Sequence, residues 1–150
     1  MISFLMVLML LQARAVFSEP ASTVTLSATF NTIPDQMYVG GLFQVIVTVQ
    51  DNAAAPQAAA GSRVTLRLDP DYAGSPRHKV TLRDASGSVV QELAATAGDD
   101  GKALFWVRLS SNSTPFKARL TATAERHQQT SSAFQSNVFK VYSADNYQNY

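Results

Sequence analysis

Apolar and polar residues alternate with a period of two along most of the chain after residue 22. The alternation is most regular in FKARLTATAE, residues 116–125, where every second side chain is apolar. A period of two is the pattern of a β-strand with one buried face and one face toward solvent. Other segments of this kind are STVTLSATF, YVGGLFQVIVTVQD, SRVTLRLDP, KALFWVRLS and AFQSNVFKVYS.

Turn-forming residues separate these segments. NTIPDQ, DPDYAGSP, SNSTP and RHQQTSS concentrate Asn, Asp, Pro, Gly and Ser. The segment RHKVTLRDASGSVVQEL predicts two short strands, with Val89 in the second, joined by a tight turn at residues 84–87. About seven or eight short strands with this spacing predict an all-β fold, an antiparallel Greek-key sandwich of the immunoglobulin-like type.

The first 18 residues differ from the rest of the chain. Ile2 to Leu11 form a nearly unbroken apolar run, which is about the length of the hydrophobic part of a signal peptide and short for a membrane-spanning helix. The small-x-small motif of a cleavage site follows as ARA at residues 13–15. We therefore predict a signal peptide or anchor at 1–18, a sandwich domain at 19–143, a polar tail at 144–150, and a secreted, periplasmic or cell-surface location.

Charge and cysteine content narrow the function classes. Twelve Lys and Arg residues oppose eleven Asp and Glu residues, so the chain has no basic footprint for nucleic acid, and we expect membrane contact only through an uncleaved leader. The chain has no cysteine, which excludes disulfides, thiol catalysis and Cys-ligated zinc. The domain must therefore be held together by its core alone.

The order of four segments resembles a known family. FQVIVTVQDNAAAPQAAAGSRVTLRL is followed by TAGDDGKALFWVRL, then by FKARLTATAE and SNVFKVY. This order is similar to bacterial Ig-like domains of the invasin/intimin type, and to related Ig-like modules such as filamin repeats, over roughly residues 22–142. The resemblance implies a non-enzymatic surface module. Such domains usually occur in tandem, whereas this sequence contains one. We therefore expect a single-module subunit rather than an adhesin stalk.

The turn GDDG at residues 98–101 raises the question of a metal site. An Asp-Gly turn is usually structural, because the carboxylate accepts hydrogen bonds from the turn's own N–H groups and Gly takes a positive φ. Calcium is the alternative, since it needs six to eight oxygen ligands. The candidate calcium ligands, all in predicted turns, are Asp69, Asp71, Asp99 and Asp100.

Trp106 is the main candidate for ligand contact. If Phe105 and Val107 face the core, Trp106 faces solvent, where it could stack on a sugar ring or anchor a partner. The opposite phase makes it a core residue, and the sequence does not decide between the two. Tyr72, in the DPDY turn, is a second candidate. Asn112 begins a glycosylation sequon that matters only if the source is a eukaryote.

No motif for catalysis is present: the chain has no HExxH, no G-x-S-x-G and no phosphate-binding Gly-rich loop. We expect no enzyme, and no cofactor apart from possible calcium. The first hypothesis is a secreted or surface module in assembly or adhesion, a structural subunit that contacts protein partners or self-associates. The alternative is a sandwich that binds carbohydrate or calcium. Residues 19–30 and the tail carry the predicted subunit contacts, with the tail residues Ala144, Asp145, Asn146, Tyr147 and Tyr150 assigned to assembly.

Overall fold

The computed structural model describes residues 25–31, 33–52, 55–75, 78–112 and 114–143. The predicted leader at 1–18 and the predicted assembly residues at 144–150 lie outside this part of the chain. The described residues form β-strands and one short 3₁₀ turn, η1 (Pro70–Tyr72). None of the described segments is a helix of the length and hydropathy needed to cross a membrane.

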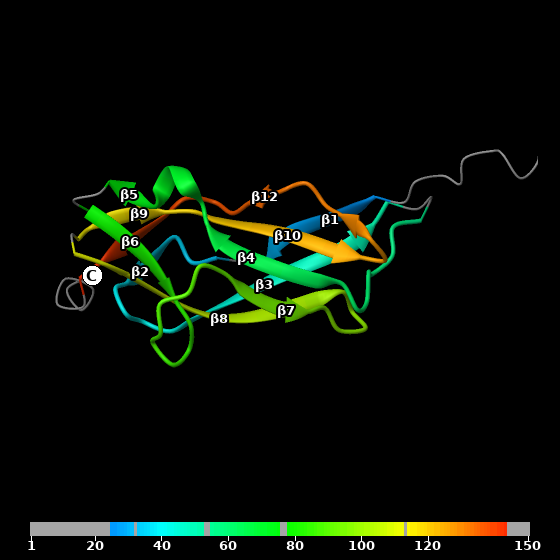
Figure 1. Cartoon of the computed structure of the whole chain (residues 1–150), viewed down its shortest axis with the longest axis horizontal. Coiled ribbons are helices and arrows are strands. Elements are labelled where there is room, and N and C mark those ends of the chain that lie inside the picture. Colours follow the sequence, from blue (N-terminus) through cyan, green and yellow to red (C-terminus); the bar gives the residue numbers. More distant parts are fainter. Residues whose placement is uncertain (1–24, 32, 53–54, 76–77, 113, 144–150) are drawn as a thin grey trace, which may run out of the picture.

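The first layer is a five-stranded antiparallel sheet (Figure 1). Its order is β1-β3-β8-β6-β5, so the longest strand, β8, lies at its centre. The strands of this sheet are β1 (Leu26–Asn31), β3 (Phe43–Asp51), β8 (Lys102–Ser111), β6 (His78–Arg83) and β5 (Gly74–Ser75).

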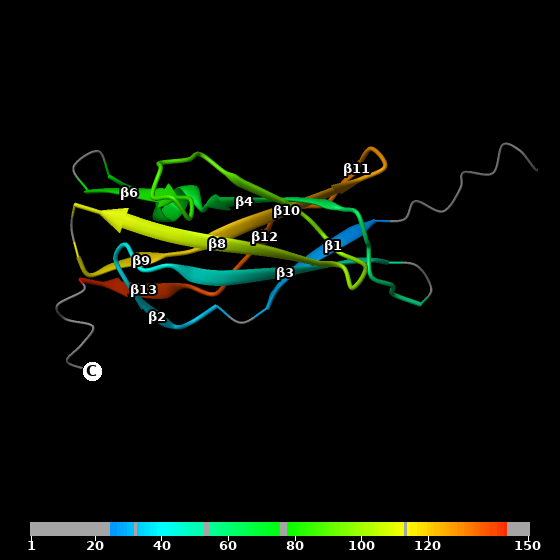
Figure 2. The ribbon, with the colours of Figure 1, turned by 90° about the horizontal axis from the view of Figure 1, so that it is seen from below.

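The second layer faces the first across the core, as Figure 2 shows from below. It is built on β4 and β10, with β7 on one side and with β11 and β12 along β10. Its strands are β4 (Arg63–Leu68), β7 (Leu93–Thr96), β10 (Leu120–Arg126), β11 (Gln129–Thr130) and β12 (Phe134–Gln135). A three-stranded sheet closes one end, with β13 (Phe139–Tyr142) between β2 (Gln36–Tyr38) and β9 (Phe116–Ala118).

The strand order defines the class of fold. The order β1-β3-β8-β6 matches the A-B-E-D sheet of an immunoglobulin domain, and β4, β10 and β12 match C, F and G. The prediction of an immunoglobulin-like sandwich is therefore confirmed. Eight of the described strands span four residues or more, and all pairs are antiparallel except β2 with β13, which run parallel.

The core comes from the alternating residues that the sequence pattern assigns to the inner face. On β3 and β8, the buried side chains are every second residue, and the residues between them face solvent or are half-buried. The largest fully buried side chains are Phe139, Leu66, Leu109, Leu120 and six valines, Val45, Val47, Val49, Val64, Val107 and Val141.

Three predicted strands differ from the observed ones. The last strand, expected in AFQSNVFKVYS, is divided, because Phe134–Gln135 pairs with β10 while Phe139–Tyr142 pairs with β2 and β9. The single strand expected at 116–125 is divided at Arg119, because Phe116–Ala118 pairs with β13 while Leu120–Arg126 pairs with β4. The strand expected around Val89 is reduced to one bridge with Arg83, since a tight turn follows β6 and Val89 is exposed. The strand after it is instead β7, whose sequence LAAT has weak alternation.

Candidate functional site

Asp69 lies at the end of β4 and is almost completely buried, with 3% of its surface exposed. Its Oδ1 accepts the Asp71 N–H at 3.0 Å, so it caps η1. Its Oδ2 accepts hydrogen bonds from three side chains on β10, β12 and the junction between β9 and β10. These donors are Arg119 Nε at 2.9 Å, Gln135 Nε2 at 3.1 Å and Thr121 Oγ1 at 3.4 Å.

The charge of Asp69 is stabilised by these contacts. Burial opposes ionisation, but the Asp71 N–H and the Arg119 guanidinium together outweigh it, so the pKa of the Asp69 carboxyl lies below its ordinary value. Both oxygens are occupied by protein donors. The carboxylate therefore ties η1 to the second sheet, and it is unsuited to exchange a proton near neutral pH.

Arg119 also covers Tyr72. Its guanidinium carbon lies 5.0 Å from the centre of the Tyr72 ring, within cation–π range. Asp71, whose side chain is 82% exposed, approaches Arg119 Nη2 at 3.8 Å. The predicted ligand-binding residue Tyr72 and the predicted metal ligands Asp69 and Asp71 thus meet in one cluster around Arg119, which the sequence did not single out. It sits at an outward position of an alternating strand, where Arg is ordinary.

The second acidic pair lies at the opposite end of the sandwich. Asp99 and Asp100 follow β7, whose last residue Thr96 is opposite Arg63 at the start of β4, whereas Asp69 follows the end of β4 (Figure 1). The six residues of β4 span about 20 Å. The four predicted carboxylates are therefore not brought together. Among the described residues, no three acidic or His side chains are grouped as a metal site, and calcium binding at either turn stays a prediction.

The GDDG turn has a structural role. The Lys102 N–H donates to Asp100 Oδ1 at 3.0 Å, and the Gly98 N–H donates to the Lys102 carbonyl at 3.0 Å. Gly101 has φ +75°, and a Cβ there would lie 2.5 Å from the carbonyl oxygen of Val49. Only glycine allows the turn to pack this closely on β3. The structural interpretation of the GDDG turn is thus supported by its geometry.

Trp106 faces solvent. The structure thus decides which alternate residues of this strand point to the core, a choice that the sequence left open. Phe105 and Val107 are buried, whereas Trp106 and Leu104 are 47% and 48% exposed on the outer face of the first sheet. Cross-strand neighbours on β3 are Gln44 for Trp106 and half-buried Ile46 for Leu104. Two large apolar side chains, each about half exposed, therefore stand side by side on the outer face of the first sheet.

Two arginines adjoin this surface. Arg83 on β6 is directly opposite Arg108 on β8, two residues from Trp106 on the same face. Arg83 donates to Ser110 Oγ and to the Gly87 carbonyl, and Arg108 donates to the Gly40 carbonyl. Arg108 Nε is buried and has no hydrogen-bond partner within the described chain. Neither guanidinium forms an ion pair with a described carboxylate. Like charges directly opposite each other are unfavourable, so this pair suits an anionic partner.

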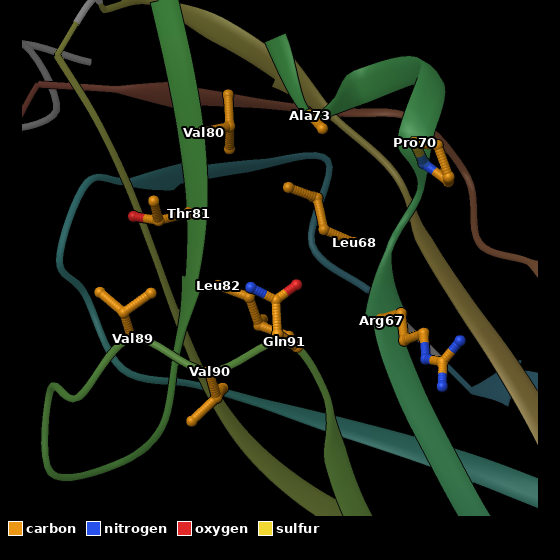
Figure 3. A pocket seen from close by; sticks show the side chains of 10 residues that line it. All are labelled: Arg67, Leu68, Pro70, Ala73, Val80, Thr81, Leu82, Val89, Val90 and Gln91. Carbon is orange, nitrogen blue, oxygen red and sulfur yellow. The ribbon is translucent and has the colours of Figure 1, made fainter. Parts of the chain in front are cut away.

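A cleft opens between the two sheets beside the last two residues of β4 (Figure 3). β7 begins opposite Leu66 and does not extend along Arg67 and Leu68. Its volume is about 350 Å³. Most of its walls are apolar, and Arg67 at its rim is paired with Glu92. The cleft is large enough for one small apolar group. Its apolar lining residues are Leu68, Pro70, Ala73, Val80, Leu82, Val89 and Val90.

Asn112, the possible glycosylation site, is exposed directly after β8. The cross-strand arginine pair was not predicted, because Arg83 and Arg108 lie 25 residues apart and only the register of β6 on β8 joins them. The sequence shows only that each of the two arginines occupies an outward position in its own alternating strand.

Comparisons with known proteins find partial similarity of shape and no match in sequence. No protein-family model and no curated protein matches it in sequence. Among solved structures, AvmM, described as catalysing macrocyclization in alchivemycin A biosynthesis, has 11% identity over 80% of this chain and 90% of that chain, with a TM-score of 0.44. Domains 4 and 5 of the S-layer protein SbsC have 11% identity over 81% and 53%, with 0.42. A lipoprotein from Bacteroides thetaiotaomicron has 12% identity over 89% and 91%, with 0.42. These partial superpositions assign neither a family nor an activity to this chain.

Proposed function

We propose that this chain is an exported, non-catalytic immunoglobulin-like module that acts by protein contact, as a subunit of a surface assembly or in adhesion. The observation that carries the proposal is the outer face of β8, where Leu104 and Trp106 are exposed beside two arginines that form no ion pair with a carboxylate of the described residues. Exposed aromatic and Arg side chains are the residues that most often anchor protein interfaces. We also propose that the chain is related to bacterial Ig-like domains of the invasin/intimin type, because its strand motifs occur in the same order.

Two carboxylates with lowered pKa values, buried Asp69 and the turn residue Asp84, support a non-catalytic role. Asp69 is held by four donors, and its lowered pKa keeps it charged. Asp84 is held likewise, because the Ser86 hydroxyl and the Ser88 N–H lower its pKa. General acids and bases need a pKa near the working pH and a free position for substrate. Neither carboxylate has these properties.

The experiment is intact mass and light scattering on protein purified from its native source. We expect a mass lacking residues 1–15 or 1–18, and a particle larger than the monomer or one that retains a bound protein. A monomer with no bound protein would overturn the proposed protein contact, and an intact leader would overturn the proposed export.

Carbohydrate is the second candidate, favoured by one observation. Trp106 presents an exposed ring with the amide of Gln44 directly across the strand, and such a pair can stack on a sugar and hydrogen-bond to its hydroxyls. Glycan binding that quenches Trp106 fluorescence and disappears in Trp106→Thr would favour it over protein contact.

A further inference from the structure

We infer that the main-chain edge of β8 at Leu104–Trp106 accepts an extended strand from a partner protein, with an acidic side chain of that strand at Arg83 and Arg108. This inference rests on the proposed function, and it names the kind of partner and the mode of contact.

The first step is the register of β8 on β3. The Val49 N–H donates to the Gly101 carbonyl at 2.8 Å, and hydrogen-bonded pairs recur at every second residue of an antiparallel ladder. Ala103, Phe105 and Val107 therefore bond to β3. The main-chain groups of Leu104 and Trp106 point away from β3, to the other edge of β8.

The second step is what occupies that other edge. Strand β6 pairs with β8 only from Arg108 to Ser111. Closer to the start of β8, Lys102 is bonded to the GDDG turn through both its N–H and its carbonyl. Between these two regions, no strand or turn of the described chain bonds to Leu104 or Trp106. The main-chain groups on this side of Leu104 and Trp106 are thus not hydrogen-bonded within the described chain.

The third step compares the unpaired part of β8 with the outer edge of the same sheet, which is formed by β1. Strand β1 bonds only to β3, but its outward side chains are Ser27, Thr29 and Asn31. Proteins protect open edges with polar or charged side chains. The β8 edge carries exposed Leu104 and Trp106 instead, so the same residues offer main-chain hydrogen bonds and apolar side-chain contact. A β-strand is the ligand that uses both.

The fourth step assigns the charge of the partner. A strand added to β8 at Leu104–Trp106 would lie in line with β6, just beyond Arg83. Its residue opposite Trp106 would lie about 7 Å from Arg83 along the strand direction, within reach of a Glu side chain. Arg108, which is opposite Arg83, would be its diagonal neighbour. A carboxylate there would separate the two guanidinium charges.

The test uses the mature full chain and two probe peptides. The first is an acetylated and amidated peptide of alternating Thr and Val with one central Glu, and the second has Gln in that place. Trp106 is the single tryptophan, so its fluorescence reports directly on the edge. We expect a blue shift of its emission, slower amide exchange at Leu104 and Trp106, and binding of the Gln peptide that is about tenfold weaker.

Three variants locate the contact, and amide exchange measures peptide binding in each of them, because Trp106→Thr has no tryptophan fluorescence. Trp106→Thr keeps strand propensity and should abolish the binding, Arg108→Gln should remove the preference for Glu over Gln, and Thr29→Lys on β1 is the matched control that should change nothing. Circular dichroism checks that each variant is folded. Exchange protection at β1 in place of β8, equal binding of the two peptides, or no binding at millimolar peptide would each overturn the inference.

The inference can fail while the proposed function stands. In that case the native protein retains its partner or assembly, but the association survives Trp106→Thr. If the native protein is a monomer with no partner, the proposed function itself fails, whatever the peptides do. A second copy of this chain recovered as the partner, lost in Trp106→Thr, would support both.

Discussion

The Arg119 Nε donates to Asp69 Oδ2 at 2.9 Å and joins two positions that are 50 residues apart in the chain. Asp69 directly follows β4, and Arg119 stands at the point where the chain passes from β9 to β10. A second contact runs in parallel, because the Asp69 N–H donates to the Arg119 carbonyl at 2.8 Å. Main chain and side chain of the same pair therefore fix the place where one strand changes sheet.

Asp69→Ala should destabilise the domain strongly. The change removes the acceptor of four donors, including a largely buried guanidinium, and breaking a buried pair from one side costs about 3–5 kcal/mol. Asp71→Ala is the matched control, since its exposed carboxylate should contribute less than about 0.5 kcal/mol. Urea unfolding of both variants measures the difference. Equal destabilisation would contradict the role given to Asp69.

Acid should weaken the fold through the same residue. Because the pKa of Asp69 is lowered in the folded state, its contribution is fully present above the ordinary carboxyl pKa of about 3.9 and is lost as the pH falls through the folded value. Asp69→Asn should therefore be less stable at neutral pH and lose less stability on acidification. Calorimetric Tm values between about pH 7 and about pH 2.5 test this. The pKa of Asp84 is also lowered, so this residue adds to the loss of stability in acid. If the Tm of the wild type and of Asp69→Asn fell by the same amount on acidification, Asp69 would be excluded as a cause of that loss.

Gly101→Ala should cost more than Gly87→Ala. Both glycines have positive φ, and an added Cβ at Gly87 meets open space. At Gly101, the Cβ would meet the Val49 carbonyl and Ala58 as well. We expect about 1–2 kcal/mol at Gly87 from backbone conformation alone, and about 2–4 kcal/mol at Gly101. Chemical unfolding of the two variants compares them, and similar values would mean that the turn can move away from β3.

Substitutions of the two neighbouring aromatic residues on β8 should lower the stability of the domain to different extents. Phe105→Ala should cost about 3–5 kcal/mol because it leaves a cavity in the core. Trp106→Thr should cost less than about 1 kcal/mol, since the ring is on the outer face. Acrylamide quenching of Trp106 in the wild type checks its exposure independently. Weak quenching together with a large loss of stability in Trp106→Thr would place the ring in the core or under a bound partner.

The alternating pattern was sufficient to predict the fold class and most of the inner face. Strands β3, β4 and β8 bury the residues expected from a period of two, because that period places every second side chain on one side of a pleated strand. The GDDG turn was also interpretable, since Asp and Gly meet its hydrogen-bonding and φ requirements locally.

Tertiary pairing decided the rest. Nothing in FKARLTATAE marks Arg119 as the point where the strand changes sheet, because the inward alternation continues without interruption across both sheets. Trp106 lies between apolar neighbours, so only packing of Phe105 and Val107 into the core sets its direction. The open edge at Leu104 and the pairing of Arg83 with Arg108 depend on where β6 ends against β8. Contacts between residues distant in the chain are not encoded in local periodicity, and the candidate binding surface is made of such contacts.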